Sequence, residues 1–156
     1  ADYAQLKLGM SQFEQMLAPD RDQTATKEAI AELTLFVQRY PQSGLLEEGR
    51  ARLREARNRL TESEYKVGYF YWRNKWYPGA IERFKAVLKN DPEYAKRDAV
   101  YYYLGDSMTK MGRRAEAVPY FDRLVKEFEQ SDFLAKAQLA LQEQPEEPAP
   151  PVKKAG

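Results

Sequence analysis

The sequence contains no cysteine and no histidine. Without cysteine the chain has no disulfide, no thiol nucleophile and no thiolate for a metal. Without histidine it lacks the commonest catalytic base and metal ligand. Catalysis would have to rest on carboxylates, lysine or hydroxyl groups alone, so the two absences argue against an enzyme. With no acidic calcium-binding loop either, neither a metal nor a cofactor is predicted.

Long apolar runs and an excess of either charge are also missing. No stretch of about 18 apolar residues appears, so no transmembrane helix is predicted. The 25 basic and 24 acidic residues give a net charge of +1, which creates no overall field for nucleic acid or an anionic membrane. No secretory signal is visible, and the chain opens in a helical pattern at Ala1, so we take it to be a processed or truncated piece.

The strongest pattern lies between positions 64 and 92 and is close to the tetratricopeptide signature L-G-x2-Y…A-x3-F…P. Its members are Gly68, Tyr71, Ala80, Phe84 and Pro92. The small residues Gly68 and Ala80 let two antiparallel helices approach closely. The rings of Tyr71 and Phe84 fill the space between them, and Pro92 ends the second helix.

The pattern is repeated along the chain. Gly105 follows Gly68, and Ala117 follows Ala80, by the same 37 residues. A weaker upstream copy consists of Ala29, Leu33, Phe36 and Pro41. Three ordered copies predict an all-α, tetratricopeptide-like, right-handed superhelix of antiparallel helix pairs, with about seven helices.

Apolar residues spaced three and four apart, together with the prolines, predict where the helices lie. The predicted ranges are about 2–17, 27–39, 43–73, 77–89, 96–110, 114–128 and 131–142. Thr24 or Thr26 is expected to cap the second helix and Ser131 the seventh. The third helix would close one repeat and open the next; the pattern gives no role to its Gly49.

Two segments of different character follow from this reading. Positions 1–143 are expected to form a helical-repeat domain of about three repeats plus a capping helix. Positions 144–156 are proline-rich and lack core residues, so a disordered or extended tail is predicted there.

Five arginines fall within ten residues of the third predicted helix. They are Arg50, Arg52, Arg54, Arg57 and Arg59. One interpretation is a patch that binds anions or nucleic acid, and the other is a solvated helix face. We favour the solvated face, because these spacings spread around the helix and because Glu48 and Glu55 lie four residues before Arg52 and Arg59. No nucleic-acid partner is therefore predicted.

Aromatic residues crowd the end of the third predicted helix and the following turn. They are Tyr65, Tyr69, Phe70, Tyr71, Trp72, Trp76 and Tyr77. Core packing is expected to use Phe70 and Tyr71, with Trp76 as a further candidate. The first helix of each repeat lines the inner groove, which predicts a partner-binding set of Tyr65, Tyr69, Trp72 and Tyr102, with Asp106 beside them. The alternative is that these rings fill the superhelix or lie under another part of a longer chain.

The run RNRLTESEYKVGYFYWRNKWYPGAIERFKAVLKNDP at positions 57–92 resembles the BamD (ComL/YfiO) family of outer-membrane assembly lipoproteins. The matched family motifs are Arg59-Leu60, Glu64, Val67-Gly68, Phe70-Tyr71, Ala80-Ile81 and Glu82-Arg83. The upstream segments YAQLKLGMSQF and FVQRYPQS, with a long DRDQ-containing loop between them, are also similar. The resemblance covers about positions 3–141 and matches the last three of the family's five repeats.

The resemblance implies a non-catalytic scaffold of the β-barrel assembly (BAM) machinery, at the periplasmic face of the outer membrane of a Gram-negative bacterium. Its implied partners are the membrane-proximal POTRA domain of BamA and other BAM subunits. The family's lipidated cysteine and amino-terminal repeats are missing from this sequence. A lipid anchor is therefore expected upstream, and no direct membrane insertion by this part of the chain.

The resemblance also implies which residues bind. Arg83 stands where the family carries an arginine associated with coupling to BamA, and we expect it to form an ion pair, flanked by Arg73, Trp76 and Tyr77. The alternative for Arg83 is an exposed helix charge worth less than about 1 kcal/mol. The alternative function is another tetratricopeptide adaptor, for example one associated with Tol–Pal or a cytoplasmic peptide-binding module. Such modules usually have shorter turns and a basic carboxylate clamp, whereas the groove predicted here is mostly aromatic.

Overall fold

Seven α-helices make up residues 1–143, the part of the chain that the computed structural model describes, and that part contains no strand. They are α1 (Asp2–Glu14), α2 (Thr24–Arg39), α3 (Leu46–Arg73), α4 (Tyr77–Asn90), α5 (Arg97–Lys110), α6 (Arg114–Glu127) and α7 (Leu134–Gln142). The predicted all-α, tetratricopeptide-like fold is confirmed. The tail predicted at positions 144–156 lies outside the described residues.

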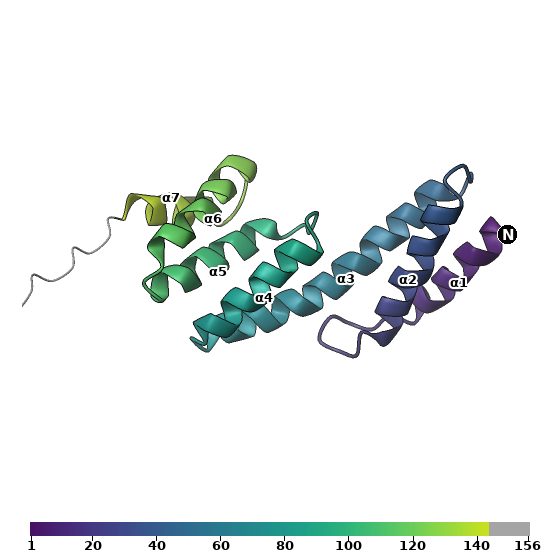
Figure 1. Ribbon diagram of the computed structural model, residues 1–156, viewed down its shortest axis with the longest axis horizontal. Helices are drawn as coiled ribbons and strands as arrows, with labels where there is room; N and C mark the ends of the chain where they lie inside the picture. The colour runs from purple at the N-terminus through teal and green to yellow at the C-terminus, as the bar shows by residue number, and fades with distance from the viewer. Residues whose placement is uncertain (144–156) are drawn as a thin grey trace, which may run out of the picture.

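The helices form a linear stack in which each packs on its neighbours in the chain. α1 pairs with α2, α3 with α4, and α5 with α6, while α7 covers the free side of α6. In Figure 1, α1 and α2 lie at one end, α4 to α7 lie at the other, and the long helix α3 runs between them. The main structural connection between the two ends of the molecule is therefore α3.

A glycine on the first helix of each pair lies against a large side chain on the second. A Cβ atom added at Gly68 would lie 2.8 Å from the ring of Phe84, closer than side chains normally approach. The same contact joins Gly105 with Phe121 and Gly9 with Leu33. The sequence pattern identified Gly68 and Gly105 but missed Gly9, which lies 59 rather than 37 residues before Gly68.

Gly49 has the same kind of role, at the junction between α2 and α3. A Cβ atom there would lie 2.5 Å from the ring of Phe36, so the glycine that the pattern left unexplained makes room for that ring. In α5, Val100 follows Val87 by the 13 residues that separate Gly49 from Phe36, and so takes the equivalent place.

The extra length of α3 separates the two ends of the stack. From Gly49 to Gly68 there are 19 residues, but only 5 from Val100 to Gly105 in the shorter helix α5. The 14 additional residues correspond to about four helical turns, or roughly 21 Å. This insertion spaces α4 away from α2.

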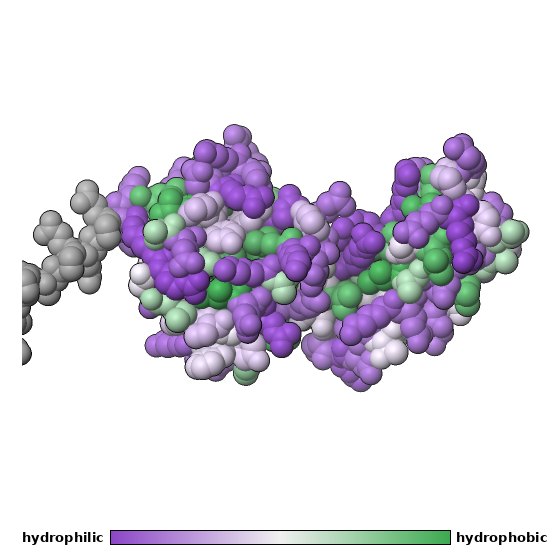
Figure 2. Space-filling model, in the orientation of Figure 1, coloured by the Kyte–Doolittle hydropathy of each residue, from purple (hydrophilic) through white to green (hydrophobic). Residues whose placement is uncertain are grey.

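The buried core is accordingly divided into two clusters. One contains Leu6, Leu33 and Phe36, and the other is built from α4 to α7 with the aromatic residues that end α3. We define the first lobe as α1, α2 and the N-terminal half of α3. The second lobe consists of the C-terminal half of α3 and α4 to α7. The outline in Figure 2 narrows between the two lobes.

The two lobes pack on different sides of α3. Ala56 is buried in the first half of the helix and Gly68 in the second half. The twelve positions between them turn the side-chain direction by roughly 120° on a helix of 3.6 residues per turn. Each half of α3 therefore has one side covered by its own lobe and another side left bare.

A polar contact links the middle of α3 to the end of α4. The carboxylate of Asp91 accepts hydrogen bonds from the Arg54 guanidinium and, at 2.8 Å, from the Thr61 hydroxyl. The Asp91 side chain is only 5% exposed. Burial alone would raise the pKa of this carboxyl, but the hydrogen bonds from Arg54 and Thr61 outweigh it and hold the pKa below its ordinary value.

Replacing Asp91 with asparagine is expected to destabilise the protein by about 1–3 kcal/mol at neutral pH, because a charge-assisted hydrogen bond is lost. A depressed folded-state pKa gives stability that is present above the ordinary value of 3.8 and is lost as pH falls through the folded pKa. The deficit of Asp91→Asn should therefore shrink in acid, as measured by urea unfolding at neutral and acidic pH. Asp122→Asn, which breaks an exposed pair with Lys126, is the control, and an equal loss in both variants would contradict the prediction.

The connection between α1 and α2 is closed by Gln23 rather than by a threonine cap. The Gln23 amide donates 2.8 Å hydrogen bonds to the carbonyls of Ala18 and Arg21, and its oxygen accepts from the buried Thr26 hydroxyl. Neither Thr24 nor Thr26 caps α2, so that prediction was wrong. Hydrogen bonds from backbone N–H groups to carbonyls three residues earlier end α1 at Glu14 rather than at position 17.

Serines precede two helices without capping them. The Ser131 hydroxyl accepts from the backbone N–H of Phe133 and donates to Asp98 of α5, so α7 begins three residues after the serine. Ser43 likewise accepts from Leu45 and donates to Asp2, and α3 begins at Leu46. Each serine joins the turn after a helix pair to the first helix of that same pair. This is why the helix that follows the turn starts later than the sequence suggested.

Candidate partner-binding surface

The bare side of the second half of α3 is apolar. Val67 is 37% exposed, Phe70 61% and Trp76, in the turn before α4, 58%. Together with the half-buried Tyr71 we call these residues the elbow surface, after the turn between α3 and α4. Exposed rings grouped in this way are typical of protein-binding sites.

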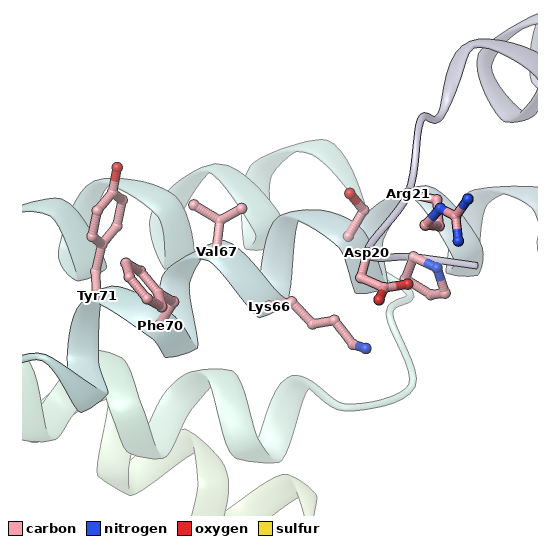
Figure 3. Close-up of a pocket in the computed structure, with 8 residues that line it drawn as sticks. Asp20, Arg21, Lys66, Val67, Phe70 and Tyr71 are labelled. Carbon is pink, nitrogen blue, oxygen red and sulfur yellow. The ribbon is translucent and has the colours of Figure 1, made fainter. Parts of the chain in front are cut away.

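A hollow of about 330 Å³ lies beside the elbow surface. One wall is the α1–α2 connection at Pro19, Asp20 and Arg21, and the other is α3; its residues in the hollow are Ser63, Lys66, Val67, Phe70 and Tyr71. Figure 3 shows Lys66, Val67, Phe70 and Tyr71 projecting from α3, with Asp20 and Arg21 on the connection. The hollow exists because the first lobe ends part-way along α3. The α1–α2 connection is the last part of that lobe that covers the helix.

The position of Phe70 corrects the sequence analysis. Phe70 was expected in the core, but it points to solvent, two residues or about 200° around the helix from the buried Gly68. Tyr71 is half-buried. The pattern identified the aromatic cluster but could not tell which side of α3 the second lobe would cover.

Trp76 is exposed but held in place. Its backbone N–H donates to the carbonyl of Tyr71 at 2.8 Å, across a turn in which Lys75 has a φ of 59°. Its indole lies directly over Gly79, where any Cβ atom would overlap it, and Tyr71 lies on the same glycine. The indole is thus presented as a fixed ring rather than a mobile side chain.

Arg83 is exposed on α4, four residues after Gly79 and so on the same helix side. It faces Glu64 of α3: burial raises the pKa of this carboxyl, and Arg83 and Lys27 offset the shift only in part. Arg73 is exposed at the last position of α3, and Tyr77 is half-buried at the start of α4. Arg83 and the three residues predicted to flank it therefore lie in one turn and the two helices that it joins.

The remaining predicted residues form an aromatic ladder along the inner side of the second lobe. Tyr69 stacks on Trp72, with ring centroids 5.7 Å apart, and the Trp72 indole N–H donates to Asp106 at 2.8 Å. Tyr102 stacks on Phe133, just before α7, at 5.2 Å, and Tyr65 lies against Phe84. All four are half-buried, so much of each ring is used in holding α3, α5 and α7 together.

The five arginines of α3 divide into two groups. Arg50, Arg54 and Arg57 lie on one stripe that, with Leu53 and Glu93, lines a second hollow of about 220 Å³. Arg52 pairs with Glu55 at 3.3 Å, and Arg59 donates to the carbonyl of Leu17 at 2.9 Å. The expected i,i+4 pairs of Arg52 and Arg59 with preceding glutamates are not formed. Arg59 instead ties the α1–α2 connection to α3.

Two features are absent from residues 1–143. In that range no cluster of three or more acidic, histidine or cysteine side chains has the geometry of a metal site. No helix there combines the length and apolar content that crossing a bilayer requires.

The stacked pairs and their glycine contacts define a tetratricopeptide-like helical-repeat protein. The model of the YfiO family, described as outer membrane lipoprotein, matches residues 1–117. The chain therefore belongs to the YfiO family.

Two relatives agree with this assignment. "Outer membrane protein assembly factor BamD" of Caulobacter vibrioides is 31% identical over 117 residues, which are 75% of this chain and 38% of that protein. The protein of the same name from Vibrio cholerae is 34% identical over 74 residues, 47% of this chain and 31% of that protein. The chain spans about a third of the length of these relatives.

Proposed function

We propose that this chain is a non-catalytic scaffold in outer-membrane protein assembly, acting within the BAM machinery at the periplasmic face of the outer membrane. The family match and the names of both relatives support the assembly role. A lipid anchor upstream, as the family's description suggests, would hold the protein at the membrane. The chain itself would act by binding other proteins.

Within this role, the elbow surface and Arg83 would dock the membrane-proximal POTRA domain of BamA. The observation that carries this proposal is the grouping of the exposed rings of Phe70 and Trp76, with the exposed cation of Arg83 one helical turn after the glycine on which Trp76 lies. Aromatic and arginine side chains dominate the binding energy of protein interfaces. Arg73 and Tyr77 would lie at the edge of the contact.

The rigidity of the elbow surface favours this mode of binding. The Trp76 ring is fixed over Gly79, and the turn before it is held by the Trp76–Tyr71 hydrogen bond. A surface formed before binding loses little conformational entropy when the partner arrives. In this proposal the ladder residues Tyr65, Tyr69, Trp72 and Tyr102 keep the helices in register and contribute secondary contacts through their exposed edges.

Arg83→Glu is expected to weaken binding to the isolated POTRA domain about tenfold or more, because an interfacial cation becomes an anion. Calorimetric titration measures the affinity, and circular dichroism and thermal melting should match the wild type. Arg83→Gln separates loss of the charge from the new repulsion toward Glu64. Lys89→Glu, an exposed reversal in the last turn of the same helix, is the control. Equal affinity of Arg83→Glu and wild type would rule out Arg83 as a contact.

A further inference from the structure

The hollow beside the elbow surface has the features of a socket for a single side chain. Val67, Phe70 and Tyr71 form its apolar side, and the α1–α2 connection closes it on the other. Its volume of about 330 Å³ is at the lower end of ligand pockets, about 300–1,000 Å³. It therefore suits one large side chain better than a cofactor.

The wall made by the connection is rigid, although it is a loop. Gln23 holds the carbonyls of Ala18 and Arg21, and Arg59 of α3 holds the carbonyl of Leu17. Arg59 attaches the start of the connection to α3, and Gln23 braces the rest of the connection from the end that leads into α2. The long connection is therefore more than a linker, because it forms one wall of a concave site.

The rim of the hollow carries two cations. Arg21 and Lys66 both line it and are exposed. Within residues 1–143 neither forms an ion pair, while one carboxylate, Asp20, lies on the same rim. An apolar floor with a cationic rim is complementary to a large apolar side chain flanked by carboxylates.

We infer that the hollow binds an extended segment of a partner protein, which inserts one large apolar side chain and places a neighbouring acidic side chain against Arg21 and Lys66. This inference deepens the proposed function and rests on it only in that the elbow surface binds protein. It makes the α1–α2 connection a specificity element, because Arg21 on the connection selects the side chain next to the inserted apolar one.

The test uses two capped peptides, acetyl-Glu-Trp-Glu-amide and acetyl-Lys-Trp-Lys-amide, titrated into the isotope-labelled full chain and followed by NMR. Weak binding is measurable in this way, and capping removes the terminal charges. The acidic peptide should shift the amide signals of Lys66, Val67, Phe70 and Arg21 saturably. It should bind at least about fivefold more tightly than the basic peptide, the effect of two partly screened ion pairs.

Arg21→Ala/Lys66→Ala should bring the two peptides to equal affinity. Arg39→Ala/Lys89→Ala, which removes two exposed cations elsewhere, should keep the preference. Phe70→Ala should weaken both peptides by removing the apolar side. Equal binding of both peptides to the wild type, shifts at other residues, or no saturable shift would overturn the inference. Binding to the POTRA domain is measured separately. A loss of POTRA binding would leave the inference about the hollow unaffected, and a lack of peptide binding would leave the proposed POTRA contact unaffected.

Discussion

Phe84→Ala is expected to lower the free energy of unfolding by about 3–5 kcal/mol, the cost of removing a buried ring and leaving a cavity. Phe84 is completely buried, and its ring lies on the backbone of α3 at Gly68. It also contacts Tyr65 and Tyr103, with ring centroids 5.9 and 6.1 Å away. Gly68, on which the ring lies, has no side chain that could fill the space.

Urea unfolding of Phe84→Ala and of Phe70→Ala makes a matched comparison. Both variants remove the same ring, but Phe70 is 61% exposed and should cost less than about 0.5 kcal/mol, as surface substitutions usually do. A loss under 1 kcal/mol for Phe84→Ala would mean that the glycine contact does not hold the second lobe together.

Phe70→Ala should instead affect binding. If the elbow surface docks the POTRA domain, removing its most exposed ring should cost about 2 kcal/mol or more, a loss of affinity of about thirtyfold. The folded structure should be unchanged, because the ring has few partners within the chain. Calorimetric titration against the isolated domain measures the effect, alongside the thermal melting curve.

Tyr3→Ala is the control for this measurement. Tyr3 is 59% exposed on α1, in the first lobe, so it presents a comparable aromatic surface far along the stack. Its removal should leave the affinity for the POTRA domain unchanged. If Phe70→Ala binds as tightly as the wild type, or if Tyr3→Ala weakens binding equally, the elbow surface is not the docking site.

Much of the fold could be predicted because tetratricopeptide packing is local in the sequence. The spacing from Gly68 to Phe84 is repeated from Gly105 to Phe121, and each contact lies within one helix pair. The sequence analysis still missed Gly9 and gave no role to Gly49. Both lie outside the 37-residue period, one before the first complete copy and one at the start of the extended helix.

The candidate site was predictable only in part. The aromatic cluster and Arg83 were identified from the sequence, but Phe70 was assigned to the core and Arg21 was not considered. Arg21 belongs to a polar loop, and nothing in a loop's composition shows which helix it will lie against. Its place at the hollow follows from two hydrogen bonds: Gln23 donates to the Arg21 carbonyl within the loop, and Arg59 of α3 donates to the carbonyl of Leu17, 42 residues away.

By itself the sequence determined the helices, their pairing and the lack of histidine and cysteine chemistry, because these depend on residue types and on contacts within a repeat. Tertiary structure alone decided which sides of α3 are covered. Its 14 additional residues place the lobes at different heights and angles along one helix, leaving a bare apolar side at one end. Exposure of that side depends on where the neighbouring elements stop, which no local pattern in α3 records.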